Sequence, residues 1–156
     1  LHHRMLLGLD GITSASASDE SSIDTEINAK MSKSKPNSCI FVHDSTEEIK
    51  KKIGAAYCPA KIVQGNPILE YIKEIVFRAF KEVTIERPIK FGGTVTYHSY
   101  VELEADFVAG KLHPMDLKNT AAIYLDKLIA PIRTHFEKDK AANKLYEEVK
   151  SFNITR

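Results

Sequence analysis

The sequence has little cysteine, no long apolar run and no surplus of charge of either sign. Its two cysteines, Cys39 and Cys58, lie too far apart for a CxxC motif, so we expect free thiols rather than a disulfide scaffold or a metal site. No stretch approaches the roughly 20 apolar residues that a membrane helix requires, and the first residues lack a signal-peptide pattern. We therefore expect a cytoplasmic protein with no membrane partner.

The balance of charge removes one simple indicator of nucleic-acid binding. Twenty-two Lys and Arg residues are offset by 21 Asp and Glu residues, which leaves a formal net charge of +1. Any contact with RNA must therefore come from a local arrangement of side chains. With 43% apolar residues in 156, the chain suffices for one compact domain, or for one domain with an appended piece of another.

The first part of the chain differs in character from the rest. Residues 1–11 carry a short apolar run that ends in a glycine-bounded turn, which predicts a buried strand and its exit. Residues 12–29 are rich in Ser, Ala and acidic residues and have little apolar periodicity, so we expect a mobile surface loop there. Residues 30–37 are basic and contain serines, and only Met31 among them suits a core.

From about residue 40 the pattern predicts short helices separated by turns. Residues 40–42, Ile-Phe-Val, are apolar enough for a short strand. Four helix starts are then marked by capping residues or by an N-terminal proline. They are Ser45 with Glu48, Asn66 with Pro67, Ser99 with Glu102, and Pro114. Gly110 is placed to end the third of these helices.

Apolar residues recur at helical spacing after two of these starts. The stripes comprise Ile68, Ile72, Ile75, Val76, Ala79 and Val83 in the second helix, and Leu117, Ala121, Tyr124, Leu125 and Leu128 in the fourth. Residues 84–89 and 94–97 have β-type side chains around a Gly-Gly pair, which predicts a small hairpin. Pro131 should kink or divide the fourth helix. A last helix carries Ala142, Leu145, Val149 and Phe152 on one face.

The segment Lys30–Ser34, Lys-Met-Ser-Lys-Ser, is a candidate for phosphate binding. Its lysines and hydroxyls can close over a polyphosphate, because an ammonium group is a mobile point charge. The alternative is a solvated basic linker, which is what most short Lys/Ser stretches are. The string is, however, identical to the KMSKS signature loop of class I aminoacyl-tRNA synthetases, which favours the first interpretation.

Further blocks resemble archaeal-type tyrosyl-tRNA synthetases in the same order along the chain. They are GAAYCP at 54–59, GNPI at 65–68, RP at 87–88, KFGG at 90–93 and HPMDLKN at 113–119. The resemblance implies a tyrosine–tRNA ligase that uses ATP with its Mg²⁺ as substrate and holds no metal of its own. It also implies that Lys33 contacts the ATP phosphates, and that Lys30, Met31, Ser32 and Ser34 help to hold the closed loop and the nucleotide.

The same resemblance implies a pocket for the first anticodon base, normally guanine. Phe91 would stack on the base, and His113 with Asp116 would bind its edge, since a carboxylate can accept from the paired N–H groups that only guanine presents. Pro114 and the helix behind it would hold the last two side chains on a rigid element.

Other members of this site are implied around that pocket. Cys58 and Pro59 would line the second anticodon base, and Lys118 would meet a phosphate or the third base. Simpler roles remain open for the central residues. An acid or a histidine at a helix start is commonly a cap, and an aromatic residue before two glycines is commonly a core residue beside a turn.

The expected fold is mainly α. Residues 39–156 would form a helical anticodon-binding domain with a small β-hairpin, and residues 1–38 the C-terminal edge, strand and KMSKS loop, of a Rossmann-like catalytic domain. The family's nucleotide-binding half is not found in the 156 residues, so we expect this chain alone not to activate tyrosine. The full-length enzyme would be a homodimer that binds tRNA-Tyr. Three alternatives stay open: a free-standing tRNA-binding module, a fragment of a tryptophanyl-tRNA synthetase, and a helical scaffold with no RNA role.

Overall fold

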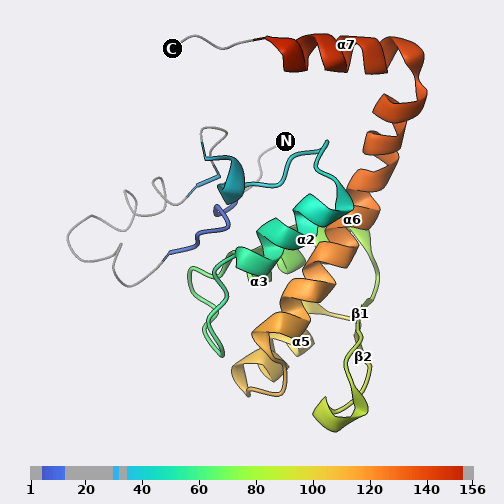
Figure 1. Cartoon of the computed structure of the whole chain (residues 1–156). Coiled ribbons are helices and arrows are strands. Elements are labelled where there is room, and N and C mark those ends of the chain that lie inside the picture. The colour runs from blue at the N-terminus through green and yellow to red at the C-terminus, as the bar shows by residue number, and fades with distance from the viewer. Residues whose placement is uncertain (1–4, 13–29, 32–34, 153–156) are drawn as a thin grey trace, which may run out of the picture.

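The computed structural model describes residues 5–12, 30–31 and 35–152. It is mainly helical and carries one two-stranded hairpin (Figure 1), which confirms the expected fold class. Nearly all of the loop predicted at 12–29 lies outside the described residues, as do Ser32, Lys33 and Ser34.

The first long helix, α2, spans Thr46–Ala55 and begins where the capping box predicts. The Ser45 hydroxyl accepts from the Glu48 amide at 3.2 Å, and the Glu48 carboxylate accepts from the Ser45 amide at 2.7 Å. Ile49 and Ile53 on one face of the helix are fully buried. Local capping thus starts the helix, and burial of its apolar stripe holds it in place.

Residues 40–42 do not form the predicted strand. The Asp44 carboxylate accepts from the Phe41 amide at 2.8 Å, and the Asp44 amide donates to the Phe41 carbonyl at 3.1 Å. These two bonds close a tight turn just before α2, so the backbone groups that a strand would need are already used.

The second helix begins at Asn66, whose side chain accepts from the amides of Ile68 and Leu69. It runs through α3 (Pro67–Tyr71), a π-helical turn η3 (Ile72–Val76) and α4 (Phe77–Ala79). Phe80 is extended and ends it. Val83 was predicted to lie on this helix, and that prediction is wrong, because Val83 begins the first strand.

The predicted hairpin is confirmed. Strand β1 (Val83–Ile85) pairs antiparallel with β2 (Val95–Tyr97), and the connection contains a 3₁₀ turn, η4 (Ile89–Phe91). Gly92 ends η4 in a left-handed conformation with φ 100°, which glycine adopts readily. The hydroxyl of Tyr124 accepts from the Thr84 amide at 2.9 Å and so joins the hairpin to the long helix α6.

Helix α5 (Tyr100–Val108) is capped by Ser99. Gly110, two residues after its last residue, has φ 79° and turns the chain away from the helix. Its capping box is half formed, because the Glu102 carboxylate accepts from the His98 amide rather than from the Ser99 amide.

The next helix, α6 (Pro114–Lys138), is not divided at Pro131. Pro131 is exposed, so water can satisfy the carbonyl group that a proline leaves unpaired.

The last helix, α7 (Lys140–Ser151), lies across the far end of α6 (Figure 1). Asp139 caps it by accepting from the Ala142 amide at 2.8 Å. The apolar side chains of Leu145, Val149 and Phe152 are each 62% exposed. Helix α7 therefore has the predicted amphipathic face but adds no residue to the core described next.

The core lies between α2, α3, α5, α6 and the hairpin, and it includes residues from the first segment. Leu7 and Leu9 are buried, and Met31 packs against the core from its edge. Leu7 makes one antiparallel bridge with Lys30; within the described residues 5–11, nothing more forms of the strand predicted at 1–11. No helix among the described residues combines the length and hydropathy that crossing a membrane requires.

Candidate nucleic-acid interface

The start of α6 places two predicted site residues close together. Pro114 is the first helical residue, and His113 is the N-cap. The Nδ1 atom of His113 accepts from the Met115 amide at 3.1 Å, and the Asp116 Oδ2 atom accepts from the His113 amide at 3.4 Å. Both side chains therefore cap the helix, as the simpler interpretation of the sequence predicts.

Capping leaves one polar atom of each side chain available. Because Nδ1 of His113 accepts a hydrogen bond, the proton of the neutral ring lies on Nε2, which is then a donor. Within the described residues, the one hydrogen bond of the Asp116 carboxylate is made by Oδ2, so Oδ1 remains an acceptor. The pair thus presents a donor and a charged acceptor to a ligand while it holds the helix start.

A cavity of about 610 Å³ opens next to this helix start. It lies between the hairpin tip, the loop that joins α5 to α6, and the turn after α2. Its lining residues are Ala60, Lys61, Arg87, Phe91, Gly110, Lys111, Leu112, His113, Pro114, Met115 and Asp116. Phe91, His113 and Asp116, which the sequence assigns to one base, therefore line the same cavity.

Phe91 is not a core residue, because 61% of it is exposed. The ammonium group of Lys90 lies 4.9 Å from the centre of its ring. An exposed aromatic ring at a cavity rim is suited to stacking on a planar ligand. The alternative role in the core is thus wrong for this residue.

Arg87 holds the hairpin tip against the loop before α6, a role that the sequence does not reveal. Its Nε donates to the Gly93 carbonyl at 2.8 Å and its Nη1 to the Lys111 carbonyl at 2.6 Å. A side chain at Gly92 would come within 2.9 Å of the guanidinium group. Arg87 thereby sets the position of Phe91 relative to His113, through carbonyl groups that no sequence pattern identifies.

Three other predicted site residues do not line this cavity. The Lys118 ammonium group donates to the Gly54 carbonyl at 3.0 Å and ties α6 to the end of α2. The Cys58 thiol accepts from the Asn66 side chain at 3.5 Å, and burial raises the pKa of this thiol. Pro59 precedes the lining residue Ala60. Cys39 and Cys58 are not joined in a disulfide.

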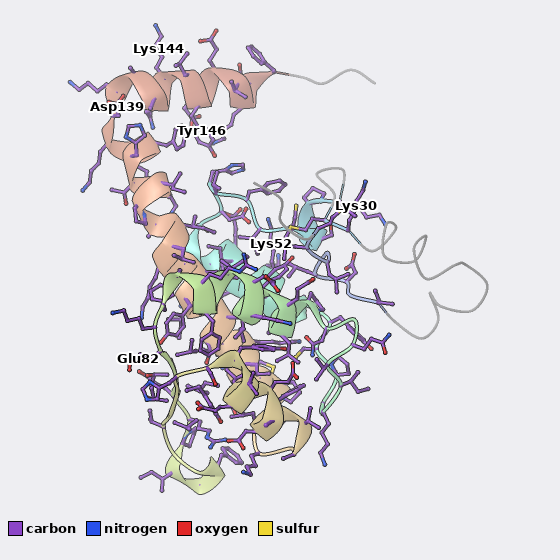
Figure 2. All side chains as sticks on the ribbon, turned by 180° about the vertical axis from the view of Figure 1, so that it is seen from behind. Lys30, Lys52, Glu82, Asp139, Lys144 and Tyr146 are labelled. Carbon is purple, nitrogen blue, oxygen red and sulfur yellow. The ribbon has the colours of Figure 1, made fainter. Side chains whose placement is uncertain are left out.

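The beginning of the KMSKS string lies elsewhere. Lys30 is exposed and lies at one side of the molecule, well away from the hairpin tip (Figure 2). Met31 contacts the core. The predicted ATP-loop residues Ser32, Lys33 and Ser34 fall outside the described residues. Lys30 and Met31, the described residues of the string, therefore do not line the cavity at the start of α6.

The comparisons with known proteins agree on one family. A family model described as tRNA synthetases class I (W and Y) matches residues 3–130. The chain is 49% identical to the tyrosine–tRNA ligase of Thermococcus kodakarensis and 48% identical to that of Pyrococcus horikoshii, each over 158 residues. Both alignments cover 100% of this chain and 41% of the relative, so the chain spans about two-fifths of the length of these curated relatives.

Solved structures show the same similarity. The tyrosyl-tRNA synthetase of Pyrococcus horikoshii, complexed with L-tyrosine, superposes with a TM-score of 0.83 at 47% identity, covering 94% of this chain and 40% of that one. For the enzyme from Aeropyrum pernix the TM-score is 0.74 at 39% identity, and the superposition covers 97% of this chain and 39% of that one. For the Leishmania major enzyme in complex with tyrosinol the TM-score is 0.77 at 30% identity, and the superposition covers 99% of this chain and 22% of that one.

Proposed function

The chain belongs to the class I tRNA synthetases of the tryptophan and tyrosine type, and from this membership we propose that it is the anticodon-reading part of a tyrosine–tRNA ligase. The whole enzyme activates tyrosine with ATP and passes the tyrosyl group to tRNA-Tyr. It acts in the cytoplasm, as a homodimer formed through parts of the protein outside this sequence. The proposed domain boundary remains at residues 38 and 39.

The observation that carries this proposal is the cavity at the start of α6. It gathers an exposed aromatic ring on Phe91, a donor on His113 and a charged acceptor on Asp116. Guanine offers adjacent N1–H and N2–H groups to a carboxylate, and its O6 and N7 atoms accept from a donor. Adenine has an acceptor at N1 and no amino group at C2, so it cannot offer the carboxylate this adjacent pair of donors.

The proposal also assigns Lys30–Ser34 to ATP, with Lys33 on the phosphates. A lysine on a closing loop stabilises the negative charge that develops as pyrophosphate leaves, and Mg²⁺ arrives with the nucleotide. The support for this assignment is the complete signature string and the exposed position of Lys30.

The test is binding of the purified chain to a tRNA-Tyr transcript and to the same transcript with adenine for the first anticodon guanine, at one moderate salt concentration. Good base contacts contribute about 1–3 kcal/mol each, so we expect the adenine transcript to bind roughly 5- to 150-fold more weakly. Equal binding to both would mean that only the RNA backbone is attracted, and the assignment of Phe91, His113 and Asp116 would be withdrawn.

Two further measurements address the alternatives. A tRNA-Trp transcript is expected to bind more weakly than tRNA-Tyr, and the reverse order would favour the tryptophan enzyme. Tyrosine-dependent pyrophosphate exchange is expected in a longer protein that includes the nucleotide-binding half, and to be at background for this chain alone. Background exchange in the longer protein would instead indicate a tRNA-binding module without catalysis.

A further inference from the structure

Lys61 has an unusual backbone conformation for a residue with a side chain. Among the described residues it is the one non-glycine residue with a positive φ, 64°. A side chain is disfavoured in this region, and glycine fits it best. A lysine at this position therefore works against the stability of the turn after α2, and such outliers cluster at functional sites.

The Lys61 side chain is directed by a second unusual residue, Gly110. Gly110 follows α5 with φ 79°, and a Cβ atom there would come within 2.5 Å of Lys61 Cε and 3.1 Å of Nζ. The side chain of Lys61 therefore crosses the backbone where Gly110 leaves room for it. From this position Lys61 lines the same cavity as Phe91, His113 and Asp116.

Three cationic residues line the cavity, and two of them already have partners. Arg87 donates to two backbone carbonyls, and Lys111 pairs with Asp106 at 2.8 Å. Within the part of the chain that the structure describes, no hydrogen bond or ion pair involves the Lys61 ammonium group. Lys61 is thus the cation of this cavity that is available to a ligand.

The backbone at the start of α6 offers no comparable site for an anion. Pro114 has no N–H group, and the Met115 amide donates to the His113 ring. The amides of Asp116 and Leu117 donate to the His113 carbonyl. The usual donors of a helix N-terminus are therefore occupied, and the side chain of Lys61 is left to meet a negative charge.

We propose that Lys61 binds the phosphate of the nucleotide whose base occupies this cavity. The inference rests on the proposed function, and it adds a backbone contact to the base contacts of Phe91, His113 and Asp116. Such a contact contributes affinity without base selectivity, because every nucleotide carries the same phosphate. It also makes binding depend on salt, since each neutralised phosphate releases a counterion.

The test compares Lys61→Gly and Lys61→Arg with the unchanged chain. Lys61→Gly removes the charge and relieves the strained φ, so we expect a higher midpoint of thermal unfolding together with roughly threefold to tenfold weaker binding of tRNA-Tyr. The loss should be equal for the guanine and adenine transcripts. The slope of log affinity against log salt should become shallower by about 0.7–0.9. Lys61→Arg should bind nearly as the unchanged chain does, and Lys144→Ala on α7 is the control for an exposed lysine (Figure 2).

A second measurement locates the phosphate. An anticodon stem-loop with a neutral methylphosphonate at the first anticodon nucleotide should bind the unchanged chain as weakly as the normal stem-loop binds Lys61→Gly. The methylphosphonate should not weaken binding by Lys61→Gly any further, because the modification and the substitution remove the same interaction. Additive losses would overturn the inference.

The remaining outcomes separate this inference from the proposed function. If the adenine transcript still binds more weakly but Lys61→Gly changes neither affinity nor salt slope, the inference is wrong and the proposed function stands. A lower unfolding midpoint with unchanged binding would mean that Lys61 only stabilises the carboxyl end of α5, which also overturns the inference. If the unchanged chain does not distinguish the transcripts, the proposed function and the inference fail together.

Discussion

His113 and Asp116 cap the start of α6, and the proposed function assigns the same two side chains to base recognition. Each satisfies a backbone amide at the start of α6, through Nδ1 and Oδ2. Within the described residues, the opposite atoms of the same groups make no hydrogen bond. In the proposed function, the helix would fix the direction of this donor and this acceptor before RNA binds, which would lower the entropy cost of binding.

Asp116→Asn tests the recognition role at this residue. An amide still offers an oxygen to the His113 amide, but it loses the charge and presents an NH₂ group in place of one acceptor. We expect tRNA-Tyr to bind on the order of 5- to 150-fold more weakly, with little change in the unfolding midpoint. Filter binding and circular dichroism measure the two quantities.

Asp139→Asn is the control, because the Asp139 carboxylate also accepts from a backbone amide at a helix start, as the N-cap of α7, at a distance from the cavity (Figure 2). It should leave tRNA binding unchanged. Equal losses of affinity in both variants would mean that capping, rather than base recognition, accounts for the effect.

Tyr71 supplies a prediction about alkaline pH. Its side chain is buried, its hydroxyl donates to the Leu7 carbonyl at 2.7 Å, and burial raises its pKa. The unfolded chain therefore releases the phenolic proton first, so this stabilisation is complete below about pH 10 and is lost as the pH rises further. Tyr71→Phe should be less stable by about 0.5–1.5 kcal/mol at pH 7.

Urea unfolding at pH 7 and at about pH 11 measures this effect. The difference in stability between the two pH values should be smaller in Tyr71→Phe than in the unchanged chain. Part of the alkaline loss should remain, because the pKa values of Tyr97 and Tyr100 are also raised, first by burial. The same pH dependence in both proteins would contradict the assignment to Tyr71.

At the scale of the elements, Arg133 joins α6 to α2. Its Nη1 donates to the Asp44 carbonyl at 2.6 Å, and its Nη2 donates to Asp126 Oδ1 at 2.9 Å. The hydroxyl of Thr46, the first residue of α2, lies 3.1 Å from both oxygens of the Asp126 carboxylate. The Arg133 side chain is 17% exposed, so this network is shielded from water.

Arg133→Lys should weaken that junction. Lysine keeps the charge but has no planar fork, so it cannot satisfy both acceptors in this geometry. We expect a loss of about 1–3 kcal/mol in the free energy of unfolding, measured by urea denaturation. Arg78→Lys is the control, because Arg78 pairs with Glu74 on an exposed helix face and should change stability by less than about 0.5 kcal/mol.

At the scale of the whole molecule, the core and the last helix are separate. The buried core residues run from Leu9 to Leu125. Helix α7 instead meets the rest of the chain through Tyr146, whose ring lies 5.6 Å from His43 and 5.9 Å from Phe136. Few buried contacts would be lost without it.

A chain that ends at Lys138 should therefore fold cooperatively. The shortened chain loses two aromatic contacts of about 0.5–1.5 kcal/mol each. Its free energy of unfolding should therefore fall by no more than roughly 3 kcal/mol. Leu9→Ala is the comparison, because Leu9 is 1% exposed in the core and truncation there should cost about 2–5 kcal/mol. Thermal unfolding followed by circular dichroism measures both, and a broad, non-cooperative transition of the shortened chain would contradict the prediction.

Helix starts and the hairpin were accessible from sequence because their causes are local. Ser45 and Asn66 accept from amides within three residues, and Pro114 has the fixed φ that suits a first helical position. The strands around Gly92-Gly93 pair with their nearest neighbour in the chain. The prediction of a strand at residues 40–42 is wrong, because Asp44 closes a turn there. Of the two outcomes predicted for Pro131, a kink or a division of the helix, division is wrong, because α6 continues through this exposed position.

By itself, then, the sequence determined the helical class, the helix starts, the KMSKS string and the candidate residues of the proposed base pocket. Only the tertiary structure decided that Phe91 lines one cavity with His113 and Asp116, and that Arg87 holds the hairpin tip there through carbonyl groups. It alone brought Lys61 across Gly110 to the same cavity. The physical reason is the distance along the chain over which each interaction acts. Capping and turn formation act over a few residues. A cavity is formed by distant segments that only the packing of the core brings together.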